Sequence, residues 1–273
     1  MSARVSLVLV AALLASTLGG PDPAAARAPA PASAPSAAAP QLRVGTFNLD
    51  RDRAFPAWRR AVVTFRREVD VAGFQEVSSR AKRRFLAAGA RWGYYGSTPG
   101  PDENPVVWDR RDLRGIGARA VRIAPSSYAT LVRLRHRATG ERYAVLNVHL
   151  VWGTSAAVDR LRLAQVRGLA RAAERQRAAG YRVLALGDFN IDHRADRRTR
   201  RPGLPARALG AVGLVSAWES GLPLRGTGSS TLGAGFVDNV WSTRRARSVR
   251  ALQRVSGGQH HPVIARYALP TRR

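Results

Sequence analysis

Polar residues that can bind cations or move protons stand at the ends of six apolar runs in this sequence. The residues at the run ends are Asn48, Glu76, His149, Asp188 together with Asn190, Asp238 and His260. A single Asn, Asp or His beside a strand is usually a turn former, a helix cap or a satisfied structural residue. Turns and caps do not require this whole combination, so we interpret these residues as parts of one site.

The residue types suit one kind of chemistry. The carboxylates of Glu76 and Asp188 and the amide oxygens of Asn48 and Asn190 are hard ligands that match Mg²⁺ or Mn²⁺. Two histidines can contact phosphate oxygens or transfer protons. Hydrolysis of a phosphodiester needs an activated water, neutralisation of the charge on phosphorus oxygens, and help for the leaving oxygen. A metal, an imidazole held by a carboxylate and amide donors supply all three.

The elements that must position these residues alternate along the chain, as in an α/β domain. Strands are predicted at Leu42–Phe47, Val69–Phe74, Tyr128–Leu134, Tyr143–His149, Arg182–Leu186, Phe236–Trp241 and Pro262–Tyr267. Helices are predicted at Ala57–Glu68, Ser79–Ala88, Ala156–Ala179 and Pro205–Ala211. The longest helix has an apolar stripe, and its arginines fall mostly outside that stripe, which is typical of a solvated outer helix.

The motifs resemble the endonuclease/exonuclease/phosphatase superfamily, the DNase I-like metal-dependent phosphoesterases. The stretches that carry the resemblance are Thr46–Leu49, Phe74–Val77, Asn147–Leu150, Gly187–Asn190, Val237–Val240 and Gln259–Pro262. They occur in the family's order and span nearly all of the sequence from residue 41 onward. The resemblance implies a four-layer α/β sandwich, in which two packed mixed β-sheets are flanked by helices and a cleft lies at one edge of the strands.

The resemblance also implies roles for individual residues. Glu76 would be the principal Mg²⁺ ligand, with Asn48 close by. Asp188 would orient or deprotonate the attacking water. Asn190 and His149 would bind the phosphate as part of the catalytic set. His260 would act as general acid/base or stabilise the transition state, paired with Asp238, which fixes its tautomer and raises its pKa. His261 is the weaker candidate, because the spacing to Pro262 favours its neighbour.

One position departs from the family pattern. The family usually has Ser-Asp-His before the x-Pro pair, and this chain has Gly258-Gln259-His260 there. Gln259 offers a carbonyl oxygen but no negative charge, so we expect it to be a weak metal ligand. Replacing even an outer-shell partner of a metal ligand typically lowers metal affinity or activity about 10–100-fold. A protein that has lost catalysis and only binds polyanions is therefore an alternative to an active enzyme.

The amino-acid composition indicates which class of molecule the protein binds. The 273 residues carry 45 Lys plus Arg against 18 Asp plus Glu, a formal net charge of +27, and no cysteine. Lacking cysteine, the chain has no disulfides, thiol nucleophile or Cys-ligated zinc. Lys82 is the only lysine, so genomic base composition explains the arginine bias as well as selection does. The charge nevertheless favours polyanions, with nucleic acid expected as the substrate.

The N-terminal region has the pattern of an export signal. A positive start at Arg4 precedes the apolar run Val5–Leu18, and small residues near Ala28 offer a cleavage site. We therefore expect a signal peptide at residues 1–28, an Ala/Pro-rich linker at 29–40, the domain at 41–269 and a tail at 270–273. The apolar run is too short for a membrane span, so no stable membrane anchor is expected. We expect the protein to be secreted and monomeric.

Several alternatives remain open at the level of sequence. A phospholipid phosphodiesterase of the sphingomyelinase kind, or a sugar or inositol phosphatase, would use the same residues as a nuclease. The stretch Gly115–Ala120 formally fits a dinucleotide fingerprint, which we reject because no buried strand precedes it. The basic stretch Arg194–Arg201 is interpreted as a mobile solvated loop, with a phosphate-gripping loop as the sharper alternative. Trp152 is assigned to the core in preference to stacking on a base.

Overall fold

The computed structural model of the chain describes residues 40–96, 103–221 and 228–270. The predicted signal peptide, the linker residues 29–39 and the tail residues 271–273 lie outside the described residues. The described residues all belong to one unit of the chain. Within them, no helix is long and apolar enough to cross a membrane.

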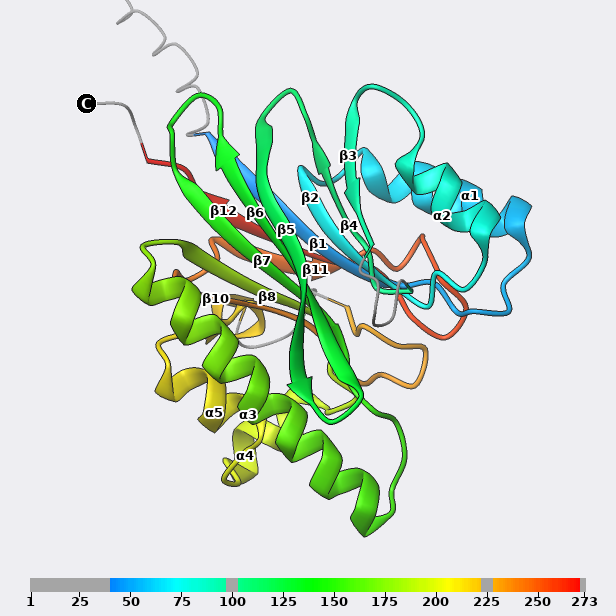
Figure 1. Ribbon diagram of the computed structural model, residues 1–273. Coiled ribbons are helices and arrows are strands. Elements are labelled where there is room, and N and C mark those ends of the chain that lie inside the picture. Colours follow the sequence, from blue (N-terminus) through cyan, green and yellow to red (C-terminus); the bar gives the residue numbers. More distant parts are fainter. Residues whose placement is uncertain (1–39, 97–102, 222–227, 271–273) are drawn as a thin grey trace, which may run out of the picture. The chain divides into compact units, whose positions relative to one another are not determined.

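Two mixed six-stranded β-sheets, counted over the described residues, lie at the centre of the fold (Figure 1). The first has the strand order β11-β12-β1-β2-β4-β3, and the second has the order β5-β6-β7-β8-β10-β9. Among these strands β1 and β2 are parallel, as are β7 and β8, and the other neighbours are antiparallel. The bounds of the first sheet are β1 Gln41–Asn48, β2 Val71–Gln75, β3 Trp92–Tyr95, β4 Val106–Asp109, β11 Ser248–Ala251 and β12 Val263–Ala268. Those of the second are β5 Leu113–Ala124, β6 Ser127–His136, β7 Arg142–His149, β8 Arg182–Asp188, β9 Val215–Ser216 and β10 Asp238–Ser242.

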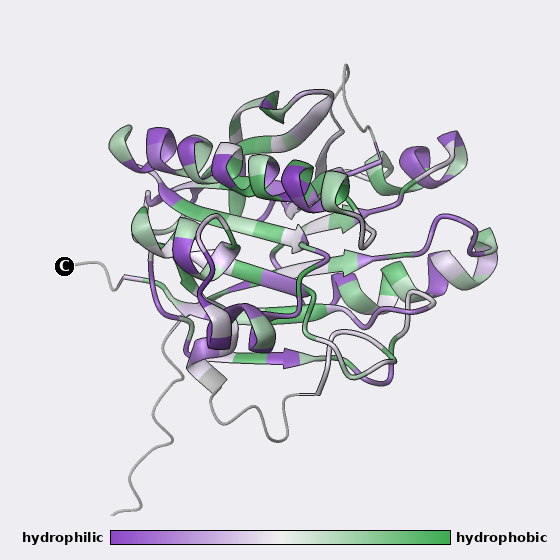
Figure 2. Cartoon of the chain, turned by 90° about the horizontal axis from the view of Figure 1, so that it is seen from below, coloured by the Kyte–Doolittle hydropathy of each residue, from purple (hydrophilic) through white to green (hydrophobic). Residues whose placement is uncertain are grey.

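Helices cover the outer face of each sheet (Figure 1). The helices are α1 Phe55–Arg66, α2 Arg80–Ala87, α3 Ala156–Ala178, α4 His193–Thr199 and α5 Pro205–Ala211, with a short 3₁₀ helix at Ala217–Gly221. One apolar cluster fills the space between the sheets, a second packs α1 and α2 on the first sheet, and a third packs α3 and α5 on the second. Figure 2 shows the helices with hydrophilic residues interleaved among hydrophobic ones, as expected of outer layers. The four-layer α/β sandwich predicted from the motifs is confirmed.

The element boundaries differ from the prediction where local chemistry overrides apolar content. Helix α1 begins two residues early because Pro56 occupies its first turn, a position where proline costs no hydrogen bond. Strand β5 was missed, since its exposed arginines and glycines suit an edge strand and hide the apolar pattern. The rejected fingerprint Gly115–Ala120 lies inside β5 and opens no helix. The short strands β3, β4, β9 and β11 were also missed.

The basic stretch after Asn190 is a helix and not the expected mobile loop. Helix α4 buries His193 and Asp196 on one side and exposes its arginines on the other. The Asp196 carboxylate accepts the backbone N–H of Ala206 at the start of α5, with 2.7 Å between N and Oδ2. The prediction failed because charged residues dominate the stretch, whereas its two inward side chains determine its structure.

Candidate active site

The alternation of side chains along each strand directs the predicted residues toward one place. In β7, Tyr143 and Val145 face the space between the sheets, so His149, at even spacing from both, faces the same way at the strand end. The same spacing directs Asp188 inward after Leu184 and Leu186 in β8. His149 and Asp188 are paired in register across the parallel strands.

The other strands bring their end residues to the same edge. Asn48 ends β1 on the inward-facing side and is paired with Gln75 of β2, directly before Glu76. Asp238 begins β10, where the antiparallel register sets it opposite Asp188. His260 lies just before β12 and forms an isolated bridge with Thr231. Residues separated by up to about two hundred positions therefore meet where the two sheets adjoin.

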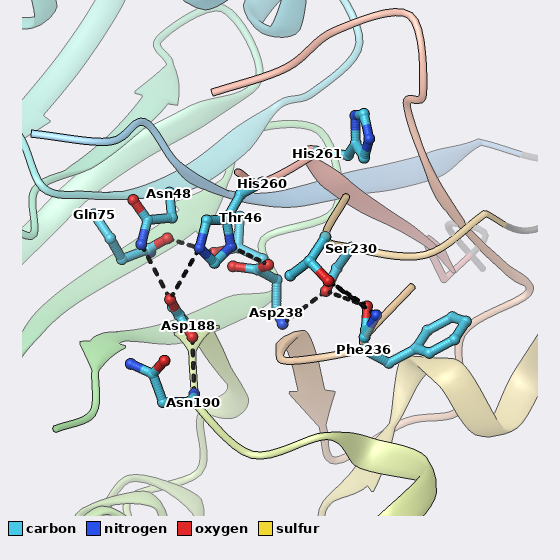
Figure 3. A network of polar contacts seen from close by, with 12 residues as sticks. Thr46, Asn48, Gln75, Asp188, Asn190, Ser230, Phe236, Asp238, His260 and His261 are labelled. Carbon is cyan, nitrogen blue, oxygen red and sulfur yellow. Dashed lines mark hydrogen bonds and ion pairs between the residues drawn. The ribbon is translucent and has the colours of Figure 1, made fainter. Parts of the chain in front are cut away.

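Asp188 is the hub of the cluster (Figure 3). The Asn48 amide nitrogen donates to Asp188 Oδ2 and to Glu76 Oε1, at 3.0 Å in both cases. His149 Nε2 lies 3.6 Å from Asp188 Oδ2 and 3.9 Å from Glu76 Oε1. On the other side, His260 Nε2 lies 3.7 Å from Asp188 Oδ2. Asp188 is buried, and two imidazoles and one amide converge on its carboxylate.

His260 and Asp238 form a coupled acid–base pair. The Nδ1 atom of His260 is 2.8 Å from Asp238 Oδ2, and the Asp238 side chain is completely buried. Burial alone would lower the pKa of His260, but the charges of Asp238, Asp188 and Glu76 outweigh it and raise the pKa to about 9. Burial raises the pKa of Asp238 to about 6, against the attraction of His260. Between these two values the pair is an imidazolium bound to a carboxylate, with Nε2 directed toward Asp188 Oδ2.

Two site residues have left-handed backbone conformations. Glu76 has φ 61° and Asn190 has φ 49°, which are uncommon for residues with side chains. The Asn190 backbone N–H donates to Asp188 Oδ1 at 2.8 Å, and its side-chain amide donates to the Leu150 carbonyl at 2.8 Å. Such strain persists where surrounding contacts hold it, and it gathers at functional sites.

Gly187 shows why the strand before Asp188 needs glycine. Its φ is 143°, and a Cβ there would lie 1.9 Å from the Val148 carbonyl oxygen. A side chain would push β7 and β8 apart at the point where His149 and Asp188 are paired. The glycine of the Gly187–Asn190 motif is therefore required by close strand contact.

Asn48 and Gln259 are both predicted as metal ligands, but Asn48 directs its side-chain nitrogen toward the carboxylates and Gln259 is exposed. The Asn48 side-chain oxygen accepts the backbone N–H of Asp50 at 3.1 Å, so the amide nitrogen is what faces the carboxylates. Gln259 is exposed, and its backbone carbonyl accepts the N–H of Leu232 at 3.0 Å. Their roles as metal ligands stay predictions. A Cβ on Gly258 would lie 2.5 Å from Asp50 Oδ2, so an acidic side chain does lie beside this loop.

A buried polar relay below the site was not predicted. Thr46 Oγ1 donates to Gln75 Oε1 at 3.2 Å, and Gln75 Nε2 donates to Asn147 Oδ1 at 2.7 Å. The Asn147 amide nitrogen then donates to three backbone carbonyls, those of Phe74, Asn104 and Pro105. The relay fixes the two sheets to each other under the catalytic edge. Its signal in the sequence was polar residues at inward positions of otherwise apolar strands.

The positions of the Trp152 and His261 side chains were not evident from the sequence. Trp152 is 81% exposed, so its assignment to the core is wrong. It follows His149 by three residues, in the segment between β7 and α3. His261 is buried, and its Nδ1 contacts the Val255 carbonyl at 2.9 Å, which leaves His260 as the histidine that faces the site.

The donor set fits a hard divalent cation. Glu76 and Asp188 offer carboxylate oxygens, and Asp188, Asp238 and His260 bring ligand atoms within 4.8 Å of one another. Asp238 Oδ1 is buried without a hydrogen-bond partner among the described residues. Several carboxylates held close together repel one another unless a cation is bound, and oxygen ligands of this kind suit Mg²⁺ or Mn²⁺ better than softer metals.

A family comparison identifies the chemistry to which this arrangement belongs. The model of the Endonuclease/Exonuclease/phosphatase family matches residues 45–259. The chain belongs to this family. It is accordingly a phosphoric ester hydrolase of the endonuclease/exonuclease/phosphatase family, whose members depend on a divalent metal. The matched residues run from β1 to Gln259 and contain almost the whole cluster.

Solved structures share the fold at low sequence identity. The catalytic domain of human nocturnin with a bound sulfate anion is 14% identical, with a TM-score of 0.61 over 84% of this chain and 94% of that one. The D. rerio TDP2 complexed with a single-strand DNA product is 16% identical, with a TM-score of 0.61 over 83% and 98%. A mannosyl-6-phosphatase of Bacteroides thetaiotaomicron is 14% identical, with a TM-score of 0.59 over 82% and 98%. A search of the curated proteins found no significant match.

Proposed function

We propose that this member of the family is a secreted phosphodiesterase that depends on Mg²⁺ or Mn²⁺ and hydrolyses DNA or RNA with little sequence preference. The observation that carries the proposal is the Asp188 cluster, in which His149 and His260 approach one buried carboxylate from two sides. Export rests on the N-terminal pattern of the sequence. Mass spectrometry of protein recovered from culture medium tests it, and an intact Met1–Arg4 segment there would contradict cleavage.

The chemistry follows from atoms that the cluster leaves available. Asp188 Oδ2, which faces both histidines, orients the attacking water and takes up its proton. His260 presents Nε2 as the donor to the phosphate or to the leaving oxygen, because Asp238 holds Nδ1. His149 and Asn190 contact the phosphate oxygens. A bound divalent cation supplies neutralisation of the phosphate charge.

The surface charge supports a polynucleotide over a small phosphate ester. The chain has a formal net charge of +27, and its single lysine, Lys82, is buried, so the positive surface is arginine. Guanidinium groups bind phosphate in a bidentate geometry and keep their charge at any physiological pH. Neutralising many backbone phosphates at once is what such a surface does best.

The exposure of Trp152 supports the same substrate class. An 81% exposed indole three residues beyond His149 gives a base beside the scissile phosphate an aromatic face. Stacking of one base on an aromatic side chain contributes about 1–3 kcal/mol and tolerates any sequence.

A phospholipid phosphodiesterase is the second candidate, and one observation favours it. Leu232 is 66% exposed, and its N–H donates to the carbonyl of Gln259, the residue before His260, so an exposed apolar residue lies near each of the two site histidines. Such side chains suit entry into a lipid surface as well as contact with bases.

The test is a substrate panel under identical conditions. Mature protein is incubated with double-stranded DNA, RNA, sphingomyelin vesicles and a phosphorylated inositol, each with Mg²⁺, with Mn²⁺ and with chelator. We expect metal-dependent cleavage of nucleic acid that His260→Ala and Asp188→Asn abolish. Preferential hydrolysis of sphingomyelin would establish the second candidate, and binding of DNA without cleavage under every metal would refute the nuclease.

A further inference from the structure

A basic pocket lies at the edge of the second sheet that is opposite the catalytic centre. It has a volume of about 500 Å³ and is lined by residues 140–142, Arg177, residues 180–182, Gly213 and Thr243. Residues 142 and 182 begin β7 and β8, whereas His149 and Asp188 end them. Because β7 has eight residues, about 25 Å separate the two edges.

The pocket presents positive charge that is only partly neutralised. Arg182 forms an ion pair with Glu141, the acidic side chain among the lining residues, and Tyr143 donates its hydroxyl to the same carboxylate. Arg142 stacks its guanidinium on Tyr181, with 4.9 Å to the ring centroid. Two arginines of the pocket are therefore left without a carboxylate partner among the described residues.

Arg142 and Arg177 are exposed in the pocket wall, and two further features of the wall suit a ligand that accepts hydrogen bonds. The guanidinium of Arg177 forms no hydrogen bond or ion pair with any described residue, although it lies beside Gly213 in the pocket wall. Thr243 Oγ1, also in the wall, is buried and has no partner within the described residues. The exposed guanidinium groups of Arg142 and Arg177 converge on one concave surface, where their N–H donors suit a tetrahedral oxyanion.

Helix α3 joins this pocket to the catalytic edge. It begins at Ala156, shortly after His149, and ends at Ala178 beside the pocket, which gives a length of about 35 Å. Exposed arginines recur along one face of the helix, with Glu174 interspersed; they are Arg160, Arg167, Arg171 and Arg175. Their spacing of seven, four and four residues keeps them on the same face, one or two turns apart.

We propose that the pocket binds a backbone phosphate of the polynucleotide whose scissile bond lies at Asp188, with the α3 arginines along the path between the two sites. This inference rests on the proposed nuclease function. A strand stacked as in duplex DNA advances about 3.4 Å per nucleotide, so a path of about 35 Å corresponds to roughly ten nucleotides of such a strand. Affinity therefore rises with substrate length until about ten nucleotides and then levels off.

The experiment compares the double variant Arg142→Ala/Arg177→Ala with the charge-matched control Arg60→Ala/Arg84→Ala, whose arginines are exposed on α1 and α2 of the other sheet. Fluorescence anisotropy in chelator measures binding of labelled single strands of about 5 and about 20 nucleotides across a salt series. For the long strand, we expect the pocket variant to lose affinity about tenfold or more, with a salt slope smaller by about 0.7, the value for one phosphate of a single strand. The control should bind as the wild type does.

Cleavage of the short strand with Mg²⁺ separates the outcomes. Unchanged cleavage by the pocket variant shows that it is folded and that its catalytic centre is intact. Equal binding of the long strand by the pocket variant and the control would overturn the inference. So would displacement of both strands by low concentrations of inorganic phosphate, which would indicate a site for a small anion. Failure of the wild type to cleave either strand would instead refute the proposed function.

Discussion

Replacing Asp238 by Asn removes one charge from the acid–base pair while keeping the shape of the side chain. The Asp238 carboxylate is fully buried and lies 2.8 Å from His260 Nδ1. An Asn side chain can accept the same hydrogen bond through its oxygen. Any change in the pKa of His260 therefore reports the lost charge and not a lost contact.

The magnitude follows from the pKa of about 9 for His260, compared with 6.5 for an ordinary histidine. This difference is worth about 3 kcal/mol. Without the charge of Asp238, burial lowers the pKa against the weaker attraction of Asp188 and Glu76, so the pKa falls toward the ordinary value of 6.5. At pH 7.5 nearly all of the wild-type imidazole is protonated, whereas an imidazole with the ordinary pKa is only about one tenth protonated. Activity at that pH should fall at least about tenfold and recover in part toward pH 6.

Two measurements check this prediction. NMR titration of the His260 ring in chelator gives its pKa directly in the metal-free protein, and kcat/KM against pH gives the consequence for catalysis. Asp112→Asn serves as the control, because Asp112 lies in the turn before β5 at the opposite edge of the second sheet. A His260 pKa that stays near 9 in Asp238→Asn would refute the reasoning.

Other predictions concern binding, stability and the metal. Trp152→Ala should raise KM for oligonucleotides roughly 5–150-fold and leave hydrolysis of a small phosphodiester without an aromatic group unchanged, because such a substrate has no ring to stack on the indole; equal effects on both substrates would contradict a stacking role. Asn147→Ala should lower the free energy of unfolding by about 2–4 kcal/mol in urea titrations, since it leaves Gln75 and three buried carbonyls without a donor or acceptor. Burial lowers the pKa of His193 to about 4, so its neutral form stabilises the fold fully above pH 6.5, and this contribution, about 3 kcal/mol, is lost as the pH falls to 4. His193→Phe should abolish that acid-side loss, and an unchanged difference between unfolding at pH 7 and pH 4.5 would disprove it. Gln259→Asp should raise Mg²⁺ affinity measured by calorimetry, and unaltered affinity would show that position 259 has no part in metal binding.

The site was predictable because its residues are strand ends. Inward and outward side chains alternate with a period of two, so an apolar strand also determines which way its final polar residue faces. The motifs around Asn48, Glu76, His149 and Asp188 thus indicated both the chemistry and the fold. The pairing of His260 with Asp238 came from the family resemblance.

The remaining features depend on contacts between distant segments. The exposure of Trp152 reflects how the loop after β7 leaves the sheet, which no local pattern encodes. Helix α4 is held by burial of His193 and Asp196 against other elements, although its composition suggests a loop. The basic pocket is formed by the beginnings of β7 and β8, the end of α3 and the residue after β10. The order of the strands had to be known before Arg142, Arg177 and Arg182 could be placed together.

The central claim is that the Asp188 cluster hydrolyses nucleic acid with a divalent metal. Its most direct test is single-turnover cleavage of an end-labelled DNA strand by the mature protein and by Asp188→Asn, with Mg²⁺ and with chelator. We predict that the wild type cleaves only with Mg²⁺, and that the variant binds the strand equally well in chelator but does not cleave it. Cleavage by the variant at the wild-type rate, or cleavage by the wild type in chelator, would contradict the claim.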